Sequence, residues 1–244
     1  MHIFDAYGKV AESEIKPTLI NGRYEFQEEE ERYILKDIIE KLLPQKSDRF
    51  LDIGCGSGDI SYGISKLVSS TSLCDNKKSI ERIKQIYLKN NFNFYPINFF
   101  DADFGDNKFD KILSYSVIQC LSKEDEIFDF LDKIIQIISS SGRALIGDIP
   151  NKDKLNRFKE SERGKIFIKR WQERKKESGI NFTKVEKYIS KGHKFVDIDD
   201  KLILKMVSYI RSKNLNAYIY EQNSNLPFGN SREDILICSK EFYF

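Results

Sequence analysis

Cysteine and histidine are scarce in this chain, and long apolar runs are absent. Among 244 residues there are 4 cysteines, and Cys55, Cys74, Cys120 and Cys238 are scattered without a Cys-x-x-Cys pair. This pattern argues against a disulfide framework and against a structural metal site. No apolar run approaches the ~20 residues that a membrane-spanning helix needs. The sequence therefore predicts a globular protein with no metal and no membrane insertion, and it leaves the oligomeric state open.

The first residues also lack the features of a secretory signal. Residues 1–5 contain no basic region followed by an apolar core. Together with the scattered cysteines, this start of the sequence leads us to expect a cytoplasmic protein.

The formal net charge of +2 hides an uneven distribution along the chain. Residues 151–194 contain 15 lysines and arginines against 6 aspartates and glutamates, so the remaining residues carry a net charge of −7. A local positive excess of this kind indicates an anionic partner. We expect a small phosphorylated or carboxylated molecule, because the near-neutral charge of the whole chain makes nucleic acid an unlikely partner.

A glycine-rich turn follows the first predicted strand, at residues 49–53. Asp52 lies near the end of that strand, and Gly54, Gly56 and Gly58 follow at alternate positions. A helical apolar pattern begins directly afterwards, so the segment predicts strand, tight turn and helix N-terminus. The Asp52 carboxylate would repel the pyrophosphate of a dinucleotide, and the third glycine comes one residue too early for that motif. No Gly-Lys-Ser/Thr follows, which excludes a P-loop.

A second acid ends the next predicted strand, at residues 71–75. This acid is Asp75, and an acid at such a position can accept hydrogen bonds from both ribose hydroxyls. Asp52 suits a ligand that carries positive charge. The expected ligand therefore has a ribose and a positive group but no pyrophosphate, and S-adenosylmethionine meets these conditions.

The chain resembles the class I S-adenosylmethionine-dependent methyltransferases over residues 45–150 and in the closing strands near its C-terminus. Residues 52–58 and Asp75 resemble the first two motifs of that family. The polar residue beside the adenine, often an aspartate in the family, corresponds to Asn98 here. Further segments resemble the fourth strand, the start of the following helix and the fifth strand: 109–114, 117–121 and 142–148.

The resemblance implies an α/β, Rossmann-like fold with helices on both faces of a seven-stranded sheet. The sheet is expected to be mostly parallel, with an antiparallel last strand. We expect one methyltransferase domain that spans the whole chain. Its expected parts are an N-terminal cap, a cofactor-binding core, a substrate-side insertion after the fifth strand, and a closing helix with strands: 1–27, 28–150, 151–198 and 199–244.

The resemblance also implies a set of residues for S-adenosylmethionine and its product S-adenosylhomocysteine. Asp52, Gly54, Gly56 and Asp75 are the first candidates, and Arg23 is a candidate for the methionine carboxylate. The other cofactor candidates are carried over position by position from the family: Asn76, Asn98, Phe99, Ser114 and Tyr115.

The acceptor side has fewer signals. Ligands of open α/β sheets bind at the carboxyl ends of strands, where Asp148 is expected to orient or deprotonate a hydroxyl. His193 is a candidate general base because imidazole titrates near neutral pH. Tyr24 is the third catalytic candidate, and Gln119 and Arg232 are candidates for binding the acceptor.

Three functions remain open at this point. Residues 145–151 and 226–237 resemble bacterial methyltransferases encoded with surface-polysaccharide genes, which implies a capsule or lipopolysaccharide precursor as acceptor. The basic stretch 151–194 would also suit an RNA methyltransferase that grips phosphates. The third function is a catalytically silent protein that still binds S-adenosylmethionine.

Overall fold

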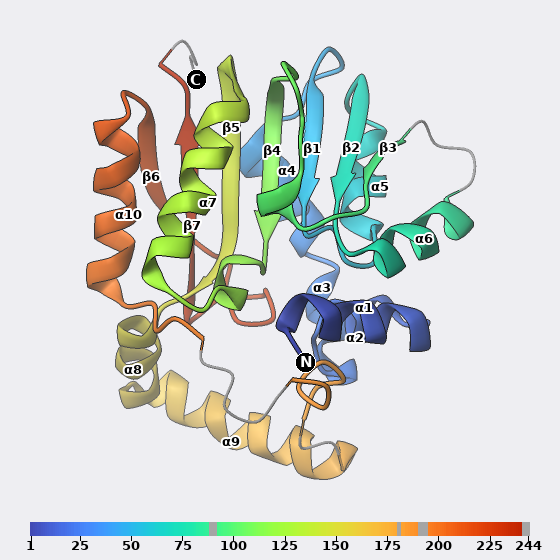
Figure 1. The fold of residues 1–244 in the computed structure, drawn as a ribbon. Helices are drawn as coiled ribbons and strands as arrows, with labels where there is room; N and C mark the ends of the chain where they lie inside the picture. Colours follow the sequence, from blue (N-terminus) through green and yellow to red (C-terminus); the bar gives the residue numbers. More distant parts are fainter. Residues whose placement is uncertain (88–91, 180–181, 190–194, 241–244) are drawn as a thin grey trace.

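The protein is built around one seven-stranded sheet with the strand order β3-β2-β1-β4-β5-β7-β6 (Figure 1). The computed structural model describes the chain except for residues 88–91, 180–181, 190–194 and 241–244. The strands are β1 (Arg49–Ile53), β2 (Ser70–Cys74), β3 (Phe92–Tyr95), β4 (Phe109–Tyr115), β5 (Ile138–Pro150), β6 (Asn216–Glu221) and β7 (Arg232–Cys238).

The sheet is parallel except for its last strand in the chain. Strands β1 to β5 pair in parallel, whereas β7 is antiparallel to both of its neighbours, β5 and β6. This arrangement confirms the expected Rossmann-like class of fold. Because the parallel strands all end on one side of the sheet, the loops after β1, β2 and β4 lie together at that edge.

Helices cover both faces of the sheet (Figure 1). One face packs against α7 (Glu124–Ile137) and α10 (Asp200–Ser212), and the other packs against α4 (Ile34–Leu42), α5 (Asp59–Ser65) and α6 (Lys77–Ile86). Side chains alternate between the faces along each strand. In β1, for example, Leu51 contacts the α7 side and Phe50 contacts the α4 side.

The N-terminal segment lies across the carboxyl ends of the parallel strands (Figure 1). It consists of α1 (Ile3–Ser13), α2 (Pro17–Ile20) and η1 (Glu25–Gln27), and α3 (Glu28–Glu31) follows it. Pro17 stands at the first turn of α2, where its missing N–H group costs no helical hydrogen bond. The short helices η2 (Phe99–Asp101) and η3 (Ile118–Cys120) follow β3 and β4 at the same edge.

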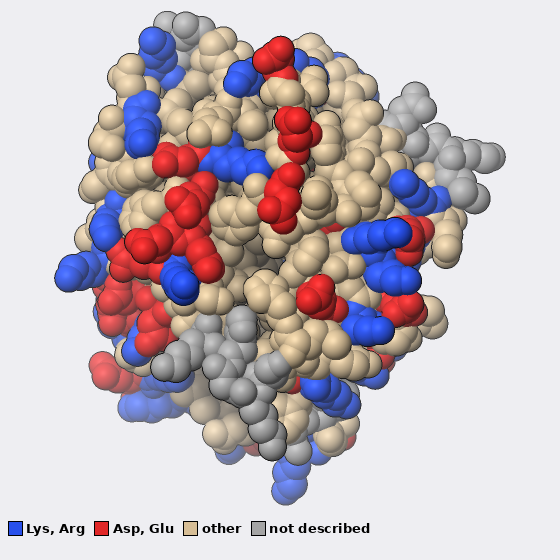
Figure 2. Space-filling model, in the orientation of Figure 1, with Lys and Arg blue, Asp and Glu red and all other residues tan. Residues whose placement is uncertain are grey.

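The segment after β5 forms two helices, α8 (Lys152–Glu160) and α9 (Glu162–Ser178). Ser161 separates them, and its hydroxyl accepts the Gly164 N–H at 3.0 Å as the N-cap of α9. Figure 2 shows acidic side chains gathered over the face formed by α7 and α10, whereas basic side chains reach the lower edge, where α9 lies. The basic segment thus lies at the edge of the sheet where the parallel strands end.

Two predicted elements differ from the structure. The helical spacing of apolar residues after the four glutamates predicts one helix at 28–43, but the structure divides it into α3 and α4 with a turn at residues 32–33. The apolar run at 143–148 predicts the fifth strand there, but β5 begins at Ile138, since Ile138 pairs with Phe109 ahead of a register shift. The polar residues 139–142 gave no strand pattern in the sequence.

The described residues contain no helix with the length and apolar character that crossing a membrane would require. Within the same part of the chain, no group of three or more histidine, cysteine or acidic side chains is placed to hold a metal ion.

Candidate active site

The glycine turn after β1 brings backbone close to its neighbours. Gly54 and Gly56 have φ angles of +75° and +54°, which side-chain-bearing residues rarely adopt. A Cβ atom on Gly54 would lie 2.4 Å from Cγ2 of Val117, and one on Gly56 would lie 2.5 Å from Oδ1 of Asn21. The turn therefore needs glycine at both positions, because Val117 and Asn21 occupy the places that side chains would take.

Two buried carboxylates flank this turn. Asp52 is 2% exposed and accepts a hydrogen bond from Ser61, and Asp75 accepts the N–H groups of Gly56 at 2.7 Å and Asn76 at 2.5 Å. Burial raises the pKa of Asp52 to about 7 and that of Asp75 to about 6. Among the described residues, neither carboxylate has an ion-pair partner. A bound cation would therefore stabilise the charged form of both acids.

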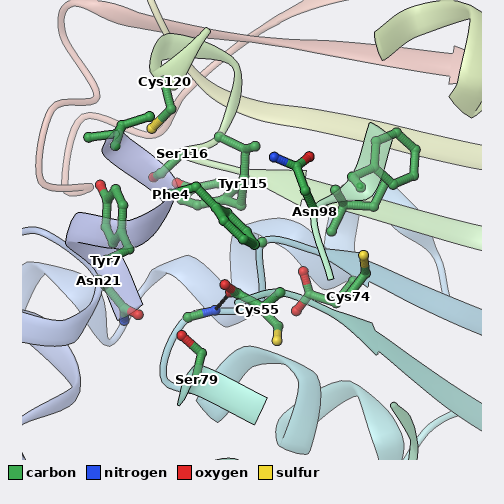
Figure 3. Close-up of a pocket in the computed structure, with 18 of the residues that line it drawn as sticks. Phe4, Tyr7, Asn21, Cys55, Cys74, Ser79, Asn98, Tyr115, Ser116 and Cys120 are labelled. Atoms are coloured by element: carbon green, nitrogen blue, oxygen red, sulfur yellow. Dashed lines mark hydrogen bonds between the residues drawn. The ribbon is translucent and has the colours of Figure 1, made fainter. Parts of the chain in front are cut away.

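A cavity of about 470 Å³ opens between the glycine turn and α1 (Figure 3). It has the size and the mainly apolar walls of a small-molecule site. Eight of the residues predicted for the cofactor lie in its wall: Arg23, Asp52, Gly54, Gly56, Asp75, Asn98, Phe99 and Tyr115. A molecule with a ribose and a positive group matches this wall, because the carboxylates and the bare glycine turn face the same space.

The loop after β3 supplies one end of the cavity. Asn98 caps η2, and its Oδ1 accepts the Phe100 N–H at 3.1 Å, which fixes the side chain. Phe99 is 6% exposed and packs edge-on against Phe130, with ring centroids 5.0 Å apart. Figure 3 shows Asn98 and Cys74 at this end of the cavity. A flat aromatic base would find an amide and an apolar wall here.

Two cofactor candidates lie outside the cavity wall. The Asn76 side chain caps α6 and donates to the Phe4 carbonyl at 3.2 Å, so it joins α1 to α6. Ser114 is buried within β4, where it is paired with Ile53 of β1. The structure therefore places both residues next to the site without giving their side chains access to it.

Tyr24 lies in an aromatic cluster between the cap and α9. Its ring stacks on Phe26 at 5.1 Å and meets the edge of Trp171 at 5.6 Å. Gln119 lies on η3 and Arg232 at the start of β7, and neither is in the cavity wall. His193 is outside the residues that the structure describes.

Asp148 is buried behind the cavity wall and contacts two arginines. Its Oδ2 lies 3.7 Å from Arg23, its Oδ1 lies 3.6 Å from Arg232, and Ser116 donates a hydrogen bond to it. Its backbone N–H binds Asp234 at 2.9 Å, and its φ angle is +59°. Arg23 also binds Glu31, so its charge is already balanced by two protein carboxylates.

Much of the cavity wall was not predicted as site residues from the sequence, and four of these residues bear on the argument below. Phe4 and Tyr7 lie one turn apart on α1, and Ser116 and Cys120 follow β4 (Figure 3). The i, i+3 spacing of Phe4 and Tyr7 places both on one face of a helix, and this was the available sign of a lid. Nothing in the local sequence distinguishes Ser116 from the other serines.

The chain matches a known family over most of its sheet. A family model described as a methyltransferase domain matches residues 44–219, which is more than half of the chain. The match includes β1 to β5 and the glycine turn.

Solved structures share the fold at low sequence identity. The N-methyltransferase NodS from Bradyrhizobium japonicum WM9, in complex with S-adenosylhomocysteine, is 11% identical, has a TM-score of 0.63, and is matched over 99% of this chain and 100% of that one. A methyltransferase in complex with the Trm112 activator of Haloferax volcanii has a TM-score of 0.66 at 11% identity, over 99% of both chains. Magnesium protoporphyrin IX methyltransferase from Synechocystis PCC 6803 has a TM-score of 0.57 at 11% identity, over 97% of this chain and 94% of that one.

Proposed function

The chain belongs to the methyltransferase domain family, and we propose that it transfers a methyl group from S-adenosylmethionine to a small-molecule acceptor. One observation carries this proposal. Two buried carboxylates without cationic partners among the described residues, Asp52 and Asp75, flank a bare glycine turn at a cavity. S-adenosylmethionine supplies an activated methyl group on a positively charged sulfur.

Different residues of the cavity wall would bind different parts of S-adenosylmethionine. In this proposal Asp75 accepts hydrogen bonds from the ribose hydroxyls and Asp52 favours positive charge nearby, and both residues line the cavity. Gly54 and Gly56 line the same cavity, and the absence of a side chain would let a ligand lie close to their backbone. Asn98 and Phe99 offer an amide and a ring edge to the adenine. Helix α1 supplies Phe4 and Tyr7 to the cavity wall, and in this proposal it keeps water from the reacting atoms.

We further propose an anionic acceptor, a phosphorylated or sugar precursor of a bacterial surface polysaccharide. The sequence resemblance at 145–151 and 226–237 and the basic charge of 151–194 support this choice. Helices α8 and α9, which carry much of that charge, lie on the side of the sheet where the parallel strands end (Figure 1). The structural neighbours do not indicate which acceptor this chain uses. They are named for different methyl-transfer reactions, and they are only 11% identical to this chain.

The proposed catalytic role of Asp148 is indirect. Its carboxylate contacts Arg23 and Arg232, and Ser116 stands between it and the cavity. Asp148 would therefore orient groups of the cavity wall, whereas direct abstraction of a proton from an acceptor would need Ser116 to move aside. Arg232 would support Asp148 from the other side.

The test is calorimetric titration of S-adenosylhomocysteine followed by an activity screen. The purified protein is incubated with S-adenosylmethionine and either sugar nucleotides and phosphorylated sugars or total RNA, and formation of S-adenosylhomocysteine is measured. We expect binding and turnover with a small-molecule pool. The absence of binding would overturn the methyltransferase proposal, and turnover with RNA alone, weakened steeply by salt, would overturn the acceptor proposal.

A further inference from the structure

Ser116 is held in an unusual conformation at the wall of the cavity. Its φ angle is +61°, and Asp148, with φ +59°, lies beside it on β5. The Ser116 N–H donates to the Gly147 carbonyl at 3.1 Å, which fixes the turn. Left-handed residues other than glycine are strained, and such residues concentrate at functional sites. Two strained residues in contact, Ser116 and Asp148, therefore indicate that this part of the cavity wall has a functional role.

The hydrogen bonds of Ser116 leave its hydroxyl only one way to contact a ligand. A serine hydroxyl has one proton and two lone pairs. The hydroxyl donates its proton to Oδ2 of Asp148, and one lone pair accepts a hydrogen bond from Nη2 of Arg23 at 2.9 Å. Arg23 and Asp148 are 6% and 5% exposed, so both partners are held in place. The remaining lone pair can accept a hydrogen bond, but the hydroxyl cannot donate one.

The hydroxyl of Tyr7 lies near that of Ser116 (Figure 3). Tyr7 comes from α1, and Cys120 follows β4 in the same part of the wall. Burial raises the pKa of Tyr7 well above its usual value, so the hydroxyl keeps its proton. Figure 3 shows Tyr7, Ser116 and Cys120 at the same end of the cavity, away from Asn98.

The charged side chains of the wall point to the same ligand chemistry. Arg23 is paired with Glu31 and Asp148, whereas Asp52, Asp75, Glu126 and Asp129 also line the cavity. An anionic group bound beside Ser116 would meet the lone pair of its hydroxyl and an Arg23 whose charge is already balanced by Glu31 and Asp148. A hydroxyl, amine or ammonium would meet hydrogen-bond acceptors.

We infer that Ser116 is a specificity residue whose oxygen accepts a hydrogen bond from an N–H or O–H group of a bound molecule. This inference rests on the proposed function and deepens it. The group has two possible sources: the ammonium of the methyl donor, or the hydroxyl or amine that receives the methyl group. In the second case the acceptor is an alcohol or amine at its reacting atom, whatever charge it carries elsewhere.

Ser116→Gly is the variant that tests the inference. Glycine accepts the φ of +61° without strain, so the variant removes the hydroxyl while keeping the backbone conformation. Ser239→Ala is the matched control, because Ser239 is 3% exposed and lies beyond β7 at the opposite end of the sheet. Thermal unfolding of both variants checks that they remain folded.

Two arms distinguish the sources of the donor group. In the first, S-adenosylhomocysteine and 5′-methylthioadenosine, which lacks the ammonium, are titrated into each protein. If the ammonium binds Ser116, Ser116→Gly weakens S-adenosylhomocysteine by ~10-fold and leaves 5′-methylthioadenosine unchanged. In the second arm, alcohols, amines, carboxylic acids and thiols are screened as methyl acceptors. If the acceptor binds Ser116, an alcohol or amine is methylated and Ser116→Gly lowers that rate by ~10-fold.

Failure of this inference differs from failure of the proposed function. A wild-type protein that binds no S-adenosylhomocysteine overturns the proposed function. The inference on Ser116 is overturned if wild type binds it, Ser116→Gly binds it equally well, and no alcohol or amine is methylated in a manner that depends on Ser116. Turnover confined to carboxylic acids or thiols, with unchanged binding in Ser116→Gly, overturns it as well.

Discussion

The two ends of the cavity are assembled from different kinds of sequence. At the glycine turn, the backbone of Gly56 meets Asp75, which is only 19 positions away, across two adjacent strands. At the other end, Arg23 of the cap meets Ser116, 93 positions away, and both contact Asp148 of β5. The first end is a local motif that any chain with this turn can form, whereas the second exists only once the cap has docked.

The largest effect is expected at the glycine turn. Gly54→Ala would place a Cβ atom 2.4 Å from the stiff side chain of Val117 and would strain a φ of +75°. We expect the affinity for S-adenosylhomocysteine to fall by ~100-fold or more in calorimetry. Gly105→Ala is the control, because Gly105 has a φ of +55° but open space around it. Equal affinities in the two variants would contradict the account of the turn.

The next largest effect is expected at the cap end, on stability. Asp148→Asn removes the negative charge between the buried Arg23 and the partly buried Arg232, which leaves both cations short of a partner. The free energy of unfolding in urea should fall by about 3 kcal/mol. Glu40→Gln, which removes an exposed i, i+4 pair with Lys36, should change it by less than about 0.5 kcal/mol. A loss in Asp148→Asn no larger than in this control would show that the cap is held by other contacts.

Donor binding at the glycine end should depend on pH. Burial raises the pKa of Asp52 to about 7 and that of Asp75 to about 6, and a cation prefers both ionised. The affinity for S-adenosylmethionine should therefore rise by about 10-fold between about pH 5.5 and 8. The affinity for S-adenosylhomocysteine, whose sulfur is uncharged, should rise less over the same pH range. Without ligand the sign is opposite: the stability that these raised pKa values give at low pH is lost as pH rises through about 6 to 7. Calorimetry at several pH values checks the first trend, and a flat profile would contradict it.

The smallest effect is expected for Tyr24. Its ring packs with Phe26 and Trp171 outside the cavity wall. Tyr24→Phe keeps this packing, so the rate of methyl transfer should stay within about twofold of wild type. Tyr7→Phe, which alters a hydroxyl of the cavity wall, should lower the rate further. A larger loss in Tyr24→Phe than in Tyr7→Phe would restore Tyr24 as a catalytic candidate.

The difference between the two ends also explains what could be predicted from the sequence. The sheet and the glycine end could be predicted because apolar runs, glycines and strand-end acids follow one another at short range, as at Asp52 and Gly54. The positions of β1 and the helix α7 follow from the same local patterns.

The cap end could not be predicted in the same way, because its contacts join segments that are distant in sequence. Ser116 becomes a site candidate only when its hydroxyl is seen between Arg23 and Asp148. Asp148 could be placed at a strand end from the sequence, but its burial behind the wall depends on the register shift of β5 against β7. The break between α3 and α4 likewise has no local sign, because residues 31–34 contain neither glycine nor proline.

The central claim is that two buried carboxylates beside the glycine turn hold the methyl donor. Titration of S-adenosylmethionine into wild type and into the double variant Asp52→Asn, Asp75→Asn at about pH 8 tests it most directly. The account predicts saturable binding in wild type and a loss of at least ~100-fold in the double variant. Equal affinity in the two proteins, or no binding in wild type, would contradict it.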